Sequence, residues 1–183
     1  RLDERWRGRL LGGWRGLVGR RWRWFRRWWG VGKMVSPSRI ARHLFILPWA
    51  WKRAFPPSTL DAIEAAIRAS ETRHGGEIRF VIENSLPPIL AWRGVSGRAR
   101  ALEVFSNLRV WDTESNSGIL IYLLLADRGI EIIADRGIAA RVTGDAWEDV
   151  ARTMEAAFRQ GDFERGALTG VAAVDALLAA HCP

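Results

Sequence analysis

The sequence is poor in cysteine. Its 183 residues include a single one, Cys182, next to the carboxyl terminus. One thiol excludes an internal disulfide framework and any zinc site built from several cysteines of one chain. The three histidines, His43, His74 and His181, are too scattered for a local metal motif.

Long apolar runs are also missing, and a membrane span needs roughly 18 to 20 apolar residues. The stretch LFILPWAW (44–51) is shorter and is interrupted by Pro48. Apolar runs near the start are interrupted by glycine and arginine, which does not fit a secretory signal. We therefore expect a cytoplasmic or peripheral membrane protein.

Familiar catalytic signatures are absent as well. GVGK (30–33) lacks the upstream glycine and the following serine or threonine of a phosphate-binding loop, and no GxSxG nucleophile elbow occurs. The sequence therefore contains no complete catalytic motif.

An excess of positive over negative charge is found in one segment only. Residues 1–33 hold ten arginines and Lys33 against Asp3 and Glu4, which leaves a net charge of +9. The whole chain has a net charge of +8, so the remaining residues are close to neutral. A nucleic-acid partner is therefore not expected from the overall charge.

Residues 1–33 also carry six of the eleven tryptophans, and two interpretations stay open. A basic and aromatic segment can lie on an anionic membrane or stack on nucleic acid. Alternatively, the segment is translated upstream sequence, because Met34 stands where the composition becomes ordinary. We favour the second interpretation.

Residues 34–56 are predicted to form an N-terminal arm, in which basic residues flank the apolar patch at 44–51. The patch either touches a membrane interface or covers an edge of the following domain, residues 57–181.

In that domain the periodicity predicts helix, strand, helix, strand, strand, helix and helix, at 58–73, 77–83, 96–109, 119–126, 130–134, 145–160 and 163–180. Ser58 and Asp145 are the expected helix caps, and SLPPIL (85–90) is an expected loop. This order predicts an α/β/α layered sandwich with a small mixed sheet that contains an antiparallel hairpin.

The five residues ADRGI occur twice, at 126–130 and 134–138. We expect the first copy to hold the turn Asp127–Gly129 of the hairpin, so that Ala126 faces Ile130 and Asp135 lies opposite Ile121. The two copies are then separate turns at opposite ends of one strand.

A candidate cation site follows from this hairpin, which brings Asp135 beside the loop 109–118. The residues Asp112, Glu114, Asn116 and Asp135 offer the carboxylate and amide oxygens that Ca²⁺ or Mg²⁺ accepts. The alternative is ordinary turn chemistry, in which these side chains bind their own backbone.

A second candidate site lies at the other end of the sheet. If the strands at 77–83 and 119–126 are parallel, Glu83, Asn84 and Asp127 share the carboxyl edge, where open α/β sheets bind ligands. Asp127 is then the candidate catalytic residue of a phosphatase, as nucleophile or metal ligand. The alternative, which we favour, is that Asp127 only shapes the turn.

Three segments resemble the TPM domain family, named for thylakoid lumen, photosystem repair and receptor-modulator proteins. They are GGEIRFVIE (75–83), the stretch from ALEVF to ADRGI (101–138) and AFRQGDFERGALTGVAAV (157–174), within a resemblance over about residues 57–180. The resemblance implies an α/β/α sandwich, association with membranes or envelopes, divalent-cation binding and, for some members, acid phosphatase activity. The family often has Asp-Asn-Gly before its central strand, where this chain has Asn116, Ser117 and Gly118.

The function predicted from the sequence is therefore a TPM-type interaction or assembly module, associated with a membrane or envelope and stabilised by a divalent cation. Its expected partner is a protein, and a membrane protein is one option. The N-terminal arm of this chain is expected to contact the membrane surface. The alternative is a metal-dependent acid phosphatase that acts on phosphomonoesters.

Overall fold

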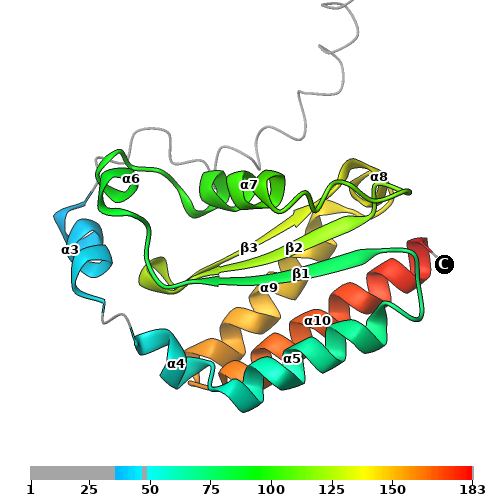
Figure 1. Cartoon of the computed structure of the whole chain (residues 1–183), viewed down its shortest axis with the longest axis horizontal. Helices are drawn as coiled ribbons and strands as arrows, with labels where there is room; N and C mark the ends of the chain where they lie inside the picture. Colours follow the sequence, from blue (N-terminus) through cyan, green and yellow to red (C-terminus); the bar gives the residue numbers. More distant parts are fainter. Residues whose placement is uncertain (1–35, 47–48, 183) are drawn as a thin grey trace, which may run out of the picture. The chain divides into compact units, whose positions relative to one another are not determined.

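The structure is a computed structural model that describes residues 36–46 and 49–182, so the predictions for residues 1–33 lie outside the described residues. Three strands form one sheet in the order β1 (Glu77–Glu83), β2 (Gly118–Leu124) and β3 (Gly129–Ala134). β1 is parallel to β2, and β2 is antiparallel to β3. The predicted mixed sheet with its antiparallel hairpin is therefore confirmed (Figure 1).

Helices cover both faces of this sheet (Figure 1). α5 (Pro57–Ser70), α9 (Gly144–Arg159) and α10 (Phe163–His181) lie on one face, and α6 (Pro88–Trp92) and α7 (Gly97–Asn107) on the other. Every residue of β2 is buried, because its side chains alternate between two apolar clusters. Ile119, Ile121 and Leu123 face α5, α9 and α10. The structure thus confirms the α/β/α sandwich.

The predicted register of the hairpin is wrong by three residues. Ile121 lies opposite Ile132 instead of Asp135. The chain leaves β2 after Leu124 through a 3₁₀ turn, η2 (Leu125–Asp127), and Arg128 takes a left-handed conformation with φ of 51°. Because this turn removes Leu125 and Ala126 from the strand, the last pair before the turn is Leu124 with Gly129, and Ile130 faces Leu123 instead of Ala126.

Several short helices add to the predicted order. α3 (Pro37–Phe45) and α4 (Ala50–Ala54) lie within the arm, and α8 (Arg136–Ala139) follows β3. α6 replaces part of the loop predicted at 85–90, because a proline is tolerated in the first turn of a helix, where its missing N–H has no partner to lose.

The predicted helix caps need correction too. Pro56, not Ser58, precedes the first turn of α5, and α9 begins after Thr143, two residues before Asp145. The predicted helix stop at Gly161 is consistent with its positive φ of 81°, directly after the C-cap Gln160. Within residues 36–46 and 49–182, no helix combines the length and apolar character that a bilayer crossing needs.

Candidate functional site

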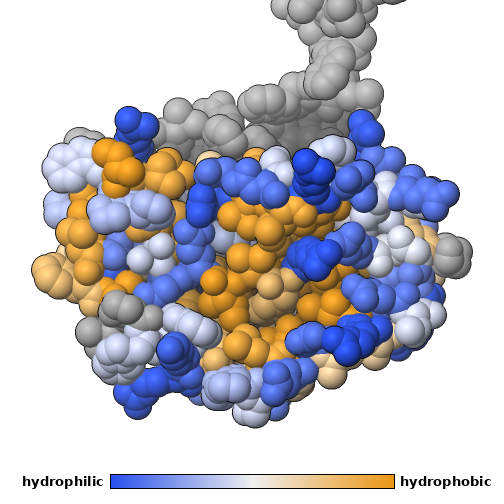
Figure 2. Space-filling view, viewed as in Figure 1, coloured by the Kyte–Doolittle hydropathy of each residue, from blue (hydrophilic) through white to orange (hydrophobic). Residues whose placement is uncertain are grey.

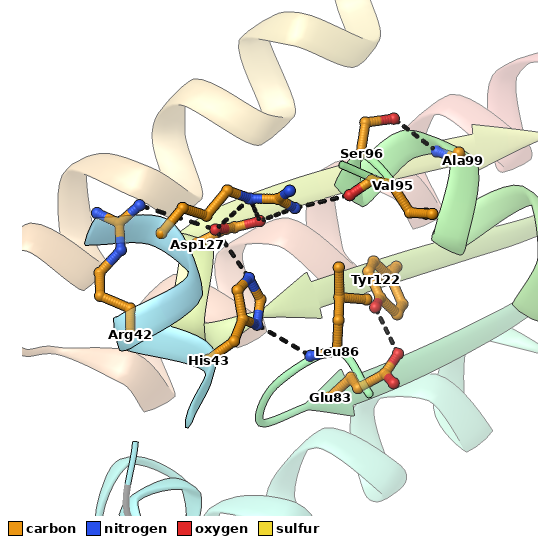
Figure 3. Close-up of polar contacts among 10 residues, drawn as sticks. Arg42, His43, Glu83, Leu86, Val95, Ser96, Ala99, Tyr122 and Asp127 are labelled. Carbon is orange, nitrogen blue, oxygen red and sulfur yellow. Dashed lines mark hydrogen bonds and ion pairs between the residues drawn. The ribbon is translucent and has the colours of Figure 1, made fainter. Parts of the chain in front are cut away.

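A polar cluster around Asp127 fastens α3 to the turn after β2 (Figure 3). The Nε of Arg39 donates to both carboxylate oxygens at 3.0 and 3.1 Å, and its Nη2 donates to Oδ2 at 2.7 Å. The Nε2 of His43 lies 3.1 Å from Oδ1, and the Nη2 of Arg42 lies 3.8 Å from the same oxygen. These three side chains meet one carboxylate because positions i, i+3 and i+4 share one face of a helix.

The imidazole of His43 is fully buried and its ring proton is placed by its neighbours. The backbone N–H of Leu86 donates to Nδ1 at 3.0 Å, so Nδ1 is the acceptor nitrogen. The neutral ring then carries its proton on Nε2, which donates to Asp127. His43 therefore connects the turn after β2 with the segment that leads into α6.

The electrostatics of Asp127 follow from these contacts. Burial alone would raise the pKa of this carboxyl, but the hydrogen bonds and charge of Arg39, with a smaller contribution from His43, outweigh it and hold the pKa below its usual range. Arg39 also donates to the carbonyl of Val95 at 2.7 Å. Since Leu86 precedes α6 and Val95 follows it, α3 is bound to both ends of α6.

A second polar group spans the sheet beneath α7. The buried hydroxyl of Tyr122 donates to Glu83 at 2.5 Å, and Arg100 of α7 donates to both oxygens of the same carboxylate at 2.9 and 3.1 Å. Burial and the hydrogen bond to Glu83 raise the pKa of Tyr122 far above its usual value. The cluster ties α7 to β1 and β2.

The carboxyl edge of the two parallel strands lies where the sequence predicted it. Asn84 follows β1, and its carbonyl accepts a hydrogen bond from the N–H of Ala126 at 3.0 Å, next to Asp127. Glu83 and Asp127 nevertheless belong to separate groups, because Arg100 binds the first and Arg39 the second. The arrangement neutralises each carboxylate separately.

The residues of the predicted cation site occupy the opposite edge. Asp112 and Glu114 are exposed, while Asp135 is buried and caps α8 by accepting from the N–H of Arg136. Asn116 accepts from Arg136 through its side chain at 2.9 Å. Asp135 does reach this loop despite the shifted register, since its N–H donates to the carbonyl of Gly118 at 2.9 Å. In the described ranges no three His, Cys, Asp or Glu side chains form a group that could hold a metal ion.

Large apolar side chains are exposed where α3 packs against α6. The exposed fractions are 54% for Leu44, 79% for Phe45, 57% for Ile89 and 69% for Trp92. We call these four residues the α3–α6 patch; Figure 2 shows hydrophobic surface over this end of the molecule.

Sequence reasoning missed the partners of Asp127 and a similar group elsewhere. His74 is buried, its Nδ1 accepts from the N–H of Gly76, and its Nε2 lies 3.2 Å from Asp175 of α10. Arg73 binds the same carboxylate at 2.6 Å. The only sequence signal for the first group is the helical spacing of Arg39 and His43, which does not point to Asp127.

Comparison with known proteins places this architecture in a family. The family model of the TPM domain matches residues 52–177, which is more than half of the chain. The chain belongs to the TPM domain family. The resemblance inferred from the sequence is therefore confirmed.

Two solved structures are similar to this TPM domain. The first is the NMR structure of the BA42 protein from the psychrophilic bacterium Bizionia argentinensis, with 31% identity, a TM-score of 0.61 and coverage of 69% of this chain and 82% of that one. The second is the N-terminal domain of a protein from P. gingivalis, with 19% identity, a TM-score of 0.56 and coverage of 67% and 74%, a likeness of fold alone. No curated protein sequence matches the chain.

The family match begins at residue 52, after α3. The helix that carries Arg39 and His43 therefore precedes the matched region, whereas its acceptor Asp127 lies inside it. The α3–α6 patch combines residues from both parts.

Proposed function

We propose that this TPM domain is a non-catalytic interaction module that docks peripherally on an anionic membrane surface through the α3–α6 patch. The observation that carries the proposal is the exposure of Leu44, Phe45, Ile89 and Trp92 on two adjoining helices. Such large side chains, gathered at one end of a domain, typically mark a docking surface.

Charge favours an anionic lipid surface as the docking partner. The patch is accompanied by two exposed cations, Arg42 on α3 and Arg93 directly after α6. An amphipathic surface with aromatic and aliphatic residues beside arginine suits the boundary between lipid headgroups and acyl chains. The fixed geometry of α3 adds to this, because Arg39 and His43 hold the helix against the turn after β2.

Vesicle co-sedimentation of the full chain tests the proposal. Phe45→Ser combined with Trp92→Ser should weaken binding to phosphatidylcholine–phosphatidylglycerol vesicles by about tenfold or more, because each large apolar side chain contributes about 1.5 to 3 kcal/mol when buried. Trp111→Ser is the matched control, since Trp111 is also exposed but follows the far end of α7. Equal binding of both variants would contradict the proposal, whatever the basic segment 1–33 contributes.

The metal-dependent acid phosphatase is the competing function, and the contacts of Asp127 argue against it. Both oxygens of this candidate nucleophile accept hydrogen bonds from Arg39, and His43 occupies a further position on Oδ1. An attacking carboxylate would have to give up these contacts. Turnover of a generic phosphomonoester by the purified chain, with and without Mg²⁺, that disappears in Asp127→Asn would favour the enzyme.

We also propose that Ca²⁺ or Mg²⁺ stabilises the loop 112–118. The supporting observation is Asp135, whose Oδ2 is buried and has no hydrogen-bond partner in the described part of the chain. Asp112, Glu114 and Asn116 would supply the further oxygens once the loop closes on the ion, which requires Asn116 to give up its contact with Arg136. Calorimetry with Ca²⁺ should show binding that Asp135→Asn weakens and that Asp145→Asn, an exposed change on α9, leaves unaltered.

A further inference from the structure

β1 is an edge strand with an open outer side. In the sheet order β1-β2-β3, the described residues provide no strand beyond β1. A groove of about 620 Å³ runs along this edge, lined by apolar side chains of α5 and β1 that include Leu60, Ile67, Phe80 and Ile82. Figure 2 shows this apolar floor framed by hydrophilic residues.

Exposed edges of this kind are usually blocked. Proteins protect them with proline, bulges, charged side chains or covering loops, since an unpaired row of N–H and C=O groups can pair with another strand. The seven residues of β1, EIRFVIE, contain no proline or glycine and pair with β2 without a bulge, and the charged residues Glu77, Arg79 and Glu83 are of both signs, so they need not repel a second strand. The edge is therefore competent to pair with a further strand.

The sequence of β1 is complementary to itself. When two copies run antiparallel with Val81 facing Val81 of the second copy, Arg79 faces Glu83 and Phe80 faces Ile82. The oppositely charged pair and the apolar pair each occur twice, because a two-fold axis passes between the two valines. Registers centred on Phe80 or on Arg79 would instead place Arg79 opposite Val81 or opposite itself, so charge selects the register centred on Val81.

We propose that this TPM domain forms a two-fold dimer in which β1 pairs with β1 of a second copy, so that one six-stranded sheet runs through both. Phe80 and Ile82 lie on the face of α5, and their partners from the second copy fill the groove. Arg79 is largely exposed and now binds Glu77 of its own strand. In the dimer it would turn to Glu83 of the second copy and add to the contacts that this carboxylate already has with Tyr122 and Arg100. The proposal rests on the open edge and not on the α3–α6 patch, so it stands independently of membrane docking.

Sedimentation equilibrium of the full chain, from micromolar to millimolar concentration, measures the association directly. We expect a monomer–dimer equilibrium whose dissociation constant rises about tenfold or more in Arg79→Glu, because two attractive pairs become repulsive. Arg152→Glu is the matched control, because Arg152 is also a largely exposed arginine in an ion pair, on α9. Circular dichroism checks that both variants keep the fold.

A crosslink tests the register without weakening the interface. Facing residues of an antiparallel pair bring their Cα atoms within the range that a disulfide spans. Val81→Cys should therefore form a symmetric disulfide under mild oxidation, identified by peptide mass, while the exposed Ser106→Cys should form little. A monomer at every concentration would overturn the proposal. So would a dimer whose dissociation constant is unchanged in Arg79→Glu and that forms no disulfide in the Val81→Cys variant.

Discussion

The buried imidazole of His43 faces the carboxylate of Asp127 at 3.1 Å, across 84 residues of sequence. Together with Arg39, this contact joins a helix that precedes the family match to the turn after the central strand. The carboxylate of Asp127 therefore helps to position α3 and its exposed apolar residues, together with the contacts of α3 to Leu86 and Val95 at the two ends of α6.

Asp127→Ala should loosen α3. The change removes the carboxylate that Arg39 and the buried His43 bind, although Arg39 keeps the carbonyl of Val95. Losing one partner of a partly buried charged group costs about 2 to 4 kcal/mol. Urea unfolding followed by circular dichroism measures the loss of unfolding free energy. Hydrogen exchange should show the largest increase in α3.

Asp149→Ala is the control for this variant, because its ion pair with Arg152 is largely exposed and is worth little. The pH dependence gives a second check. Since the folded pKa of Asp127 is lowered, its stabilisation is present above the ordinary carboxyl pKa and is lost as the pH falls through the folded value. Equal stability of Asp127→Ala and wild type at neutral pH would refute the anchoring role.

Glu131 should give the opposite pH dependence. Burial raises the pKa of this β3 carboxyl to about 6, against the lowering effect of Arg98 and with a small raising effect of Glu155. The folded state binds the extra proton, so this stabilisation is present below about pH 4.5 and is lost as the pH rises through 6. Glu131→Gln should therefore gain about 2 kcal/mol relative to wild type between pH 4.5 and pH 7. Glu64→Gln, in a largely exposed ion pair on α5, is the control in the same urea titrations, because such a pair is worth little.

Tyr122 is the one tyrosine of the chain, so its ionisation can be followed by absorbance alone. Burial and the hydrogen bond to Glu83 oppose the phenolate. We predict no tyrosinate absorbance near pH 10, where an exposed tyrosine ionises, until the protein unfolds at higher pH. A reversible tyrosinate signal at that pH in the folded chain would mean that the Tyr122–Glu83 contact does not exist in solution.

Gly118 should not tolerate a side chain. A Cβ at this position would lie within 1.7 Å of the carbonyl oxygen of Val110, which is backbone and cannot move away cheaply. Gly118→Ala should destabilise the domain by about 3 kcal/mol or more. Gly129→Ala, at the start of β3, meets no atom within 4 Å and should be nearly neutral. Thermal unfolding of the two variants side by side decides the point.

The sequence predicted those features that composition and periodicity encode. The apolar run ILIYLLL predicted a strand buried on both faces, which the structure shows up to Leu124, and the alternation of EIRFVIE predicted the neighbouring strand. The hairpin register failed for a local reason. The turn was expected at Asp127–Gly129, but it begins with the 3₁₀ turn at Leu125, which composition does not reveal, and Arg128 takes the left-handed conformation.

The candidate sites could be predicted from the sequence only in part. Asp127 could be placed at the carboxyl edge because the strands at 77–83 and 119–126 were expected to be parallel, which puts their carboxyl ends at the same edge of the sheet. Its partners could not be found, since Arg39 lies 88 residues away and no periodic pattern connects them. Likewise, the buried state of Asp135 depends on α8, a four-residue helix that gives too little periodicity to predict.

Hydrogen exchange of the full chain with and without anionic vesicles tests the central claim, docking through the α3–α6 patch, most directly. We predict protection in the peptides that cover α3 and α6, and none in α9 and α10, which lie on the other face of the sheet. Protection confined to residues 1–33, or unchanged exchange throughout α3 and α6, would contradict the account.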